Sequence, residues 1–140
     1  MNMTNETSPG HSKKVVGIEL VAEAVEAAKA NATKNGLDNC QFIAGDVMVE
    51  VTNLHDPADV IILDPPRDGI HPKAIFKILD FKPKTFVYVS CKATSLARDL
   101  PFFVAAGYEV KKVKCVDMFP HTGHVECVVL LQRDQNIFSW

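Results

Sequence analysis

Apolar segments that stop at chemically reactive side chains constrain this chain more than any other feature of its sequence. The segment Phe86–Ser90 stops at Cys91, the segment Val60–Leu63 stops at Asp64, and a further strand-like segment opens near Glu126. Short apolar runs of this kind are typical of strands buried in a parallel sheet. Ligands of open α/β sheets bind at the carboxyl ends of the parallel strands. We therefore predict an α/β fold with a reaction centre at one edge of its sheet.

The rest of the chain alternates predicted strands and helices. Strands are expected over Val15–Glu19, Gln41–Ala44, Val60–Leu63 and Phe86–Ser90, and helices over Ala22–Asn35, Pro72–Leu79 and a segment from an N-cap at Thr94 to Ala106. Two strand-like segments, Tyr108–Phe119 and Val125–Leu131, follow with only a short break, which predicts an antiparallel pair at one edge. The segment 47–55 is ambiguous. This alternation, closed by a strand pair, indicates an α/β sheet.

Composition limits the classes of protein to which the chain can belong. Its 140 residues suffice for one domain, and 47% hydrophobic with 23% charged residues are typical of a soluble globular protein. A net charge of −2 provides no basic field for a nucleic acid, although a catalytic domain can leave RNA binding to other parts of a protein. Neither a membrane span nor a signal peptide is indicated. The four cysteines form no CxxC pair, and free thiols suit a reducing, cytoplasmic setting.

Three motifs, in order along the chain, resemble those of one enzyme family. They are Asp64-Pro65-Pro66-Arg67, then Ser90-Cys91 followed by Leu96-Ala97-Arg98-Asp99, and then the segment from Asp117 to Glu126. On these motifs, the chain from about Lys14 to Gln132 resembles the C-terminal catalytic part of the RNA uracil-5-methyltransferases. The resemblance implies a Rossmann-like class I methyltransferase sheet, mostly parallel with an antiparallel C-terminal strand pair. It also implies S-adenosyl-L-methionine as the cofactor and tRNA or rRNA as the substrate.

Two departures from the family pattern bear on what the chain does. Lys92-Ala93 follows the cysteine where the family usually has Asn-Pro, but the thiol and the following helix are kept. No Gly-rich turn of the kind that cradles the methionine part of the cofactor precedes Val15, and the first strand of the domain is missing with it. We therefore expect a truncated methyltransferase domain over residues 14–134 that is inactive by itself. Residues 1–13 are expected to be a disordered leader or an added extension, and residues 135–140 a tail.

The missing first strand leads to an expectation about the sheet. In the complete fold that strand lies between the strands that end at Glu19 and Asp64. Its removal exposes two inner edges, and buried unpaired backbone groups cost about 1–3 kcal/mol each. An open edge also invites pairing with another chain. We expect the gap to be closed by direct pairing, by part of the leader, or by self-association with a second copy, and the cofactor affinity to be far below that of a complete enzyme.

The resemblance assigns catalytic roles to three residues. C5 of uracil becomes nucleophilic only after a thiolate has added to C6, and a base must later remove the C5 proton. Cys91 matches the nucleophile, Glu126 the base, and Asp64 a residue that lies between cofactor and uracil and accepts a hydrogen bond. The alternative for Cys91 is a small buried hydrophobic residue, and for Asp64 a cap of the turn at Pro65-Pro66. Cys127 is expected to face the other side of its strand.

Further residues are assigned to the cofactor and the substrate. Glu19 suits the ribose hydroxyls of the cofactor and Asp46 its adenine side, while their alternatives are a solvated charge at a helix start and a turn residue. Asp64 is counted with this cofactor set as well. Arg67 either contacts phosphate or holds its loop, and His121 is assigned to the substrate-binding loop that presents Glu126. No metal site is expected, because two histidines without a third ligand are poor indicators of one.

Two alternatives from other classes stay open at this point. The first is a non-catalytic binding module that keeps the fold but loses the cofactor with the Gly-rich turn. The second is an amino-methyltransferase, because Asp64-Pro65-Pro66 also resembles motifs that hold an amine. The pair of Cys91 and Glu126 argues against the second, since nitrogen methylation needs no thiol adduct.

Overall fold

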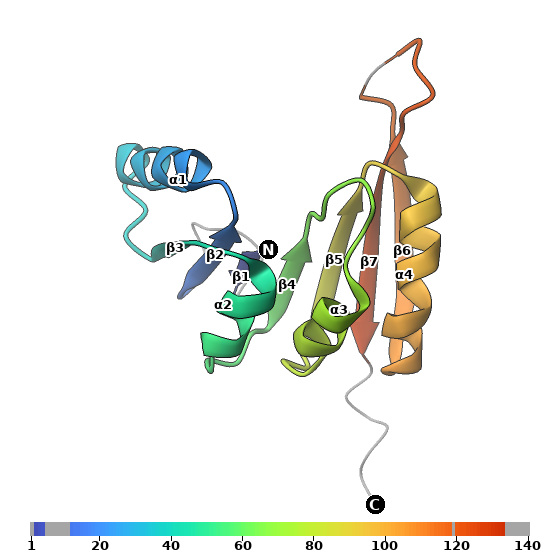
Figure 1. Cartoon of the computed structure of the whole chain (residues 1–140), viewed down its shortest axis with the longest axis horizontal. Helices are drawn as coiled ribbons and strands as arrows, with labels where there is room; N and C mark the ends of the chain where they lie inside the picture. Colours follow the sequence, from blue (N-terminus) through green and yellow to red (C-terminus); the bar gives the residue numbers. More distant parts are fainter. Residues whose placement is uncertain (1, 5–11, 119, 134–140) are drawn as a thin grey trace, which may run out of the picture.

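The computed structural model describes residues 2–4, 12–118 and 120–133. Its strands are β1 (Asn2–Thr4), β2 (Val15–Glu19), β3 (Cys40–Ala44), β4 (Val60–Leu63), β5 (Thr85–Ser90), β6 (Tyr108–Val116) and β7 (Glu126–Arg133). Its helices are α1 (Ala22–Lys34), α2 (Val47–Asn53), α3 (Pro72–Leu79) and α4 (Ala93–Ala105). The strands form one sheet in the order β3-β2-β1-β4-β5-β7-β6, with α2, α3 and α4 in front of it in Figure 1 and α1 beside β2 and β3.

The strand directions confirm the predicted sheet. β2 pairs with β3 in parallel, β4 pairs with β5 in parallel, and β7 runs antiparallel to both β5 and β6. β1 is antiparallel to β2 and to β4, so β2 and β4 share a direction. Within the described ranges, β2 to β6 therefore all run the same way. The carboxyl ends of these strands meet at one edge, as the sequence predicted.

The central position of the sheet is filled by the start of the chain. Asn2, Met3 and Thr4 pair with Gly17, Val16 and Val15 on one side, and with Ile62, Ile61 and Val60 on the other. The expectation that the leader closes the gap is confirmed, and the expectation of a disordered leader is wrong for these three residues. The physical reason is that two strand edges with unpaired N–H and C=O groups stabilise any extended segment placed between them. Residues 1, 5–11 and the predicted tail lie outside the described residues.

The hydrophobic core lies between the sheet and the helices α3 and α4. Alternate residues of β5 and β7 point into it, and Phe86, Tyr88, Val129 and Leu131 are fully buried there. Phe103 of α4 packs edge-on against Phe86, with ring centroids 5.1 Å apart. Aromatic side chains of this size supply most of the apolar area that a small core buries. The core therefore fixes α4 against β5, the strand that ends at Cys91.

Most element boundaries lie within one or two residues of the sequence predictions, and the largest differences concern α4, β6 and the segment 47–55. Helix α4 begins at Ala93 with Lys92 as its N-cap, so the N-cap predicted at Thr94 is wrong. The cause lies in the preceding turn, where the Ser90 hydroxyl bonds the N–H and the C=O of Lys92. The ambiguous segment 47–55 forms α2, and β6 ends at Val116, whereas Phe119 lies outside the described residues.

The role of β1 leads to a first prediction. Met3→Pro removes a backbone N–H from the centre of the sheet, and proline is tolerated only at sheet edges. We expect the free energy of unfolding to fall by about 1–3 kcal/mol, because a carbonyl of β2 or β4 loses its partner. Met3→Ala keeps the N–H and should be clearly less destabilised. Urea denaturation of both variants measures the difference, and equal losses would contradict the pairing of β1.

Candidate active site

The polar residues that the sequence singled out gather at one edge of the sheet. Glu19 is the last residue of β2, and Asp46, Asp64 and Cys91 follow β3, β4 and β5 within two residues. Strand β7 is antiparallel, so it starts at this same edge with Glu126. The order along the edge is Asp46, Glu19, Asp64, Cys91 and Glu126. Glu19, Asp46 and Asp64, the three residues assigned to the cofactor, thus follow one another along the edge, and Asp64 is the one nearest to Cys91 and Glu126.

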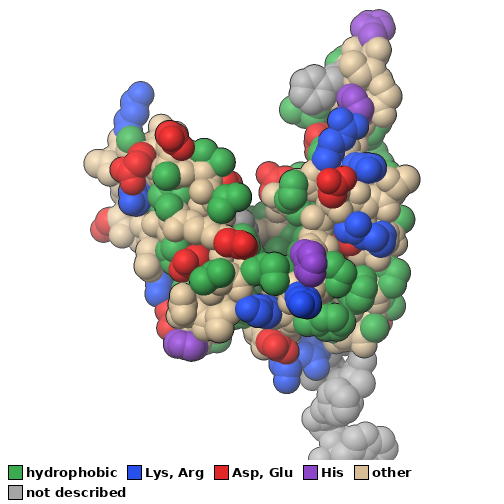
Figure 2. Space-filling view, in the orientation of Figure 1, with side chains coloured by type: hydrophobic (Ala, Val, Ile, Leu, Met, Phe, Trp, Pro, Cys, Tyr) green, Lys and Arg blue, Asp and Glu red, His purple; other side chains and the backbone are tan. Residues whose placement is uncertain are grey.

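A cleft of about 370 Å³ opens between β2 and β4. Its polar lining includes Glu19, Asp46 and Asp64, and its apolar lining comes mainly from Ile18, Val47, Met48, Leu63, Ile70 and Ile78. The surface is hollowed between the β2–β3 side and the β4–β7 side of the molecule (Figure 2). An apolar cleft of this volume with a few polar groups is typical of a small-molecule site. The three carboxylates predicted to hold one cofactor therefore share one cleft.

Two of these carboxylates also serve the local backbone. An oxygen of Glu19 accepts a hydrogen bond of 2.9 Å from the N–H of Val21, which precedes α1. An oxygen of Asp46 accepts one of 2.8 Å from the N–H of Met48 and caps α2. The turn role considered for Asp46 is therefore present, and it is compatible with a place in the cleft because each bond occupies only one carboxylate oxygen.

Asp64 behaves differently from these two residues. Its side chain is exposed and accepts no hydrogen bond from the described part of the chain. The turn that follows it is closed by the backbone, where the N–H of Gly69 donates to the carbonyl of Pro66 at 2.8 Å. The alternative role of Asp64 as a turn cap is thus taken by other groups. Asp64 thus lines the cleft without serving the local backbone.

Cys91 and Glu126 lie at the ends of two paired strands. Ser90 of β5 lies opposite Cys127 of β7 in the last pair of this ladder, and Cys91 and Glu126 are the next residue along each strand. Both residues are half-buried, and no hydrogen bond joins them. A ring placed over this pair would meet a thiol and a carboxylate from the same side. Ser90, to which sequence reasoning gave no role, fixes the turn at Cys91 through its two bonds to Lys92.

The remaining thiols do not share this environment. Cys127 faces the core side of β7 and is buried, which confirms its predicted orientation. Its sulfur lies 3.5 Å from that of Cys115. Burial, followed by the hydrogen bond and charge interaction with Cys115, raises the pKa of Cys127. A buried thiol with a raised pKa is a poor nucleophile, because the thiolate is the reactive form. Cys91 is the thiol that follows directly on a parallel strand beside Asp64, whereas the sulfur of Cys115 contacts that of Cys127.

The residues assigned to the substrate are only partly brought to the site. The guanidinium of Arg67 lies 3.0 Å from Nδ1 of His124, which ties the segment after β4 to the β6–β7 connection. That contact supports the loop-holding role of Arg67. His121 is exposed, does not line the cleft and has a φ of 74°, which is unusual outside glycine. The connection that carries it projects beyond the edge of the sheet (Figure 1).

In the described ranges, no group of three or more His, Cys, Asp and Glu side chains converges as it would around a metal ion. Among the helices described there, none is long and apolar enough to cross a membrane.

The fold and this edge of the sheet define a class I methyltransferase domain. The family profile of the tRNA (Uracil-5-)-methyltransferases matches residues 7–134, and the chain belongs to this family. An uncharacterized RNA methyltransferase of Caldanaerobacter subterraneus subsp. tengcongensis is 54% identical over 122 residues, which cover 87% of this chain and 27% of that protein. The chain therefore spans about a quarter of the length of such relatives.

Two solved structures are also similar. The Pyrococcus abyssi tRNA (uracil-54, C5)-methyltransferase in complex with S-adenosyl-L-homocysteine matches with a TM-score of 0.70 and 33% identity, over 83% of this chain and 28% of that one. An rRNA methylase of Streptococcus thermophilus matches with a TM-score of 0.65 and 18% identity, over 91% and 77%, and supports the fold alone. The cofactor of the family is S-adenosylmethionine. The cleft fits it, since carboxylates suit ribose hydroxyls and amines, and the apolar wall suits a flat base.

The double role of Asp46 leads to a second prediction. Asp46→Ala removes the cap of α2 and should lower the free energy of unfolding by about 1 kcal/mol. Asp46→Asn keeps the cap, because asparagine is as good an N-cap as aspartate, and should leave stability nearly unchanged. Thermal denaturation measures both variants. A loss in Asp46→Asn equal to that in Asp46→Ala would show that the charge, not the cap, stabilises this corner.

Proposed function

We propose that this chain is the catalytic part of an S-adenosylmethionine-dependent enzyme that methylates C5 of uridine in RNA through a covalent adduct on Cys91. The single observation that carries the proposal is the order of Asp64, Cys91 and Glu126 on three successive strands of the sheet. Neighbouring strands are about 4.8 Å apart, so the three side chains lie along about 10 Å of the edge, a distance over which all three can reach one bound pyrimidine. Nitrogen methylation requires no such thiol, and the amino-methyltransferase alternative is disfavoured.

The proposed reaction has three steps, which are attack on C6, transfer of a methyl group to C5, and removal of the C5 proton. The sulfur of Cys91 forms a bond to C6 of uracil, and the electron pair of the C5–C6 double bond moves into an enolate. C5 then takes a methyl group, which bound S-adenosylmethionine would supply by breaking its methyl–sulfonium bond, so that its sulfur would leave as a neutral thioether. Glu126 accepts the proton from C5, and the returning electrons restore the double bond and expel the thiolate. The proposal is supported by the absence of a hydrogen bond between Cys91 and Glu126 among the described residues, because both groups are then free to meet the ring.

The cofactor would be held by the residues of the cleft. Glu19 and Asp46 would bind its ribose and adenine, and the apolar side chains of Met48 and Ile70 would pack on the base. Asp64 would stand between the cofactor and the uracil, because β4 lies between the cleft and the strand that ends at Cys91. Its carboxylate, which accepts no hydrogen bond from the described residues, would take one from the substrate.

The RNA and the setting are inferred from relatives and from chemistry. The similar Pyrococcus abyssi protein is named for uracil-54 of tRNA, and other relatives are named only as RNA methyltransferases. We infer a tRNA or rRNA substrate in the cytoplasm, where free thiols persist. Phosphate contacts require basic side chains, and this chain has a net charge of −2. We therefore infer that most phosphate contacts come from regions such as those that the longer relatives have outside the matched part.

One observation favours the alternative of a non-catalytic module for the chain by itself. Asn2 pairs near the carboxyl edge and Thr4 near the opposite edge, so β1 runs against the direction of β2 and β4. The resemblance implies a parallel strand at this position, which ends in a Gly-rich turn beside the cofactor. Calorimetric titration of residues 1–140 with S-adenosyl-L-homocysteine separates the two. Tight binding would contradict the weak affinity that we expect.

The nucleophile is tested by a third prediction. In a full-length protein that contains this chain, Cys91→Ala should lower methylation more than about 10³-fold, because no adduct activates C5. Binding of S-adenosylmethionine should persist, since Cys91 does not line the cleft. RNA containing 5-fluorouracil should form a covalent complex with the unchanged enzyme and with the control Cys40→Ala, but not with Cys91→Ala. Substantial turnover by Cys91→Ala would refute the assignment.

The base is tested by a fourth prediction. Glu126→Gln removes the proton acceptor, so release of the product should slow by about 10²–10⁴-fold while attack on C6 continues. The methylated ring should then stay on Cys91, and a denaturation-resistant RNA–protein species should accumulate with ordinary uridine. Gel electrophoresis under denaturing conditions detects it. If turnover falls and no such species forms, Glu126 has another role.

A further inference from the structure

Asp99 is a buried carboxylate that the proposed reaction does not use. Its side chain is completely inaccessible to solvent. One oxygen accepts hydrogen bonds from the N–H of Ile70 at 2.8 Å and from the hydroxyl of Tyr88 at 2.7 Å. The other accepts from Nε of Arg98 at 2.9 Å and forms an ion pair with Nη2 of the same guanidinium at 2.8 Å. A buried charge is retained only where it is paired and hydrogen-bonded in this way.

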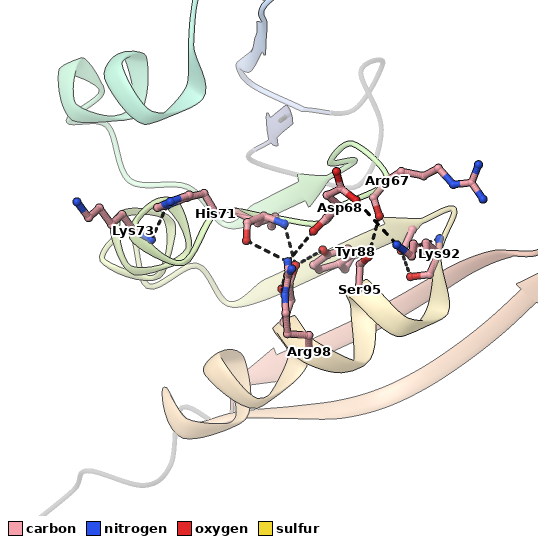
Figure 3. A network of polar contacts seen from close by, with 11 residues as sticks. Arg67, Asp68, His71, Lys73, Tyr88, Lys92, Ser95 and Arg98 are labelled. Atoms are coloured by element: carbon pink, nitrogen blue, oxygen red, sulfur yellow. Dashed lines mark hydrogen bonds and ion pairs between the residues drawn. The ribbon is translucent and has the colours of Figure 1, made fainter.

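The contacts of Asp99 belong to a larger set that holds one loop segment. Helix α4 contacts the backbone of the segment Arg67–His71 at several points (Figure 3). The hydroxyl of Ser95 donates to the carbonyl of Arg67 at 2.7 Å, and Arg98 donates to the carbonyl of Asp68 at 2.7 Å. Asp99 accepts from the N–H of Ile70. Three residues of α4 thus fix successive peptide groups of the segment that follows Asp64-Pro65-Pro66.

Gly69 shows how closely the segment and the carboxylate approach each other. Its φ is +79°, and a Cβ atom at this position would come within 2.5 Å of an oxygen of Asp99 and 2.6 Å of Nη2 of Arg98. The half-exposed guanidinium of Arg98 could shift, but Asp99 cannot move far, because it is buried and bonded to Tyr88 and Ile70. Only glycine therefore allows the backbone to pass this carboxylate.

The two sides of this contact belong to the two halves of the proposed site. Gly69, Ile70 and His71 line the cofactor cleft together with Asp64. Tyr88 lies on β5, three residues before Cys91, and its hydroxyl keeps its proton because burial and the bond to Asp99 raise its pKa. The Asp99 carboxylate is therefore the point at which the wall of the cleft is attached to the strand of the nucleophile.

We propose that Asp99 is a positioning residue of the active site: it fixes the Arg67–His71 wall of the cofactor cleft against the strand that ends at Cys91. This proposal rests on the proposed function, because it concerns the distance between cofactor and nucleophile. It assigns a role to Arg98 and Asp99 of the motif Leu96-Ala97-Arg98-Asp99, which take no part in the proposed reaction. The segment it holds carries no catalytic group, so Asp99 acts through the geometry of the cleft.

Asp99→Asn is the discriminating variant, since it has the same shape and one donor in place of an acceptor. In either orientation its NH₂ group faces a donor, which is the N–H of Ile70 or the guanidinium of Arg98. The measurement is amide hydrogen exchange on residues 1–140. We expect Asp99→Asn to accelerate exchange at Gly69 and Ile70 about tenfold or more. Exchange at Val129 and Leu131 in the core should change by less than about twofold.

Two further variants make this measurement decisive. Asp38→Asn makes the same charge change at an exposed position and should leave all these rates unchanged. Tyr88→Phe removes one donor to Asp99, keeps the ring near Phe103, and should accelerate exchange at Ile70 by less than Asp99→Asn does. If Asp99→Asn does not fold, Tyr88→Phe carries the test. Unchanged exchange at Ile70, or an equal acceleration at every amide, would overturn the proposal.

A kinetic measurement in a full-length protein that contains this chain tests the link to function. A disordered wall lowers the fraction of molecules able to bind cofactor, so Asp99→Asn should raise KM for S-adenosylmethionine about tenfold and leave KM for RNA unchanged. A merely structural lesion would lower kcat through the loss of folded enzyme and leave both KM values unchanged, which would overturn the proposal. Failure of the unaltered protein to methylate RNA would instead refute the proposed function, while the exchange result would stand.

Discussion

Backbone pairing in the middle of the sheet is the constraint on which the rest of this structure depends. Strand β1 joins β2 on one side to β4 on the other, so three residues connect the β2–β3 half to the β4–β7 half. Strand pairing draws on N–H and C=O groups that nearly every residue carries. A segment of unrelated sequence can therefore occupy the place of a missing strand, provided that two open edges offer it partners on both sides.

The candidate site inherits its dimensions from this pairing. Glu19 ends β2 and Asp64 follows β4, and β1 is the one strand between them in the sheet. Two strand spacings amount to about 10 Å. The strand between them therefore sets the width of the cleft. Because β1 pairs with both neighbours, it keeps this width although its direction is antiparallel. The two walls of the cleft are thus held at a fixed separation.

The segment after Asp64 is held from two directions. Ser95, Arg98 and Asp99 of α4 bind its backbone from the core side. The side chain of Arg67 reaches His124, which lies two residues before Glu126. The loop beside the cofactor cleft is therefore attached both to the strand of the proposed nucleophile and to the approach to the proposed base. Fixed relative positions of this kind are what a reaction between three groups requires, because small displacements of reacting groups are costly in rate.

The sequence by itself determined the strands, their polar ends and the edge at which they meet. Hydrophobic periodicity and turn residues are local signals, so Val60–Leu63 with Asp64 and Phe86–Ser90 with Cys91 could be predicted without coordinates. Local signals gave the wrong helix start where a neighbouring turn fixed the backbone. Thr94 was expected to be the N-cap of α4, but the turn held by Ser90 makes Lys92 the N-cap. The strand formed by Asn2–Thr4 and the role of Asp99 were decided only by the tertiary structure. Both features depend on partners that are distant in the sequence. The strand Asn2–Thr4 pairs with residues near position 60, and Asp99 accepts a bond from Ile70, 29 positions away. Only folding brings such groups within bonding distance.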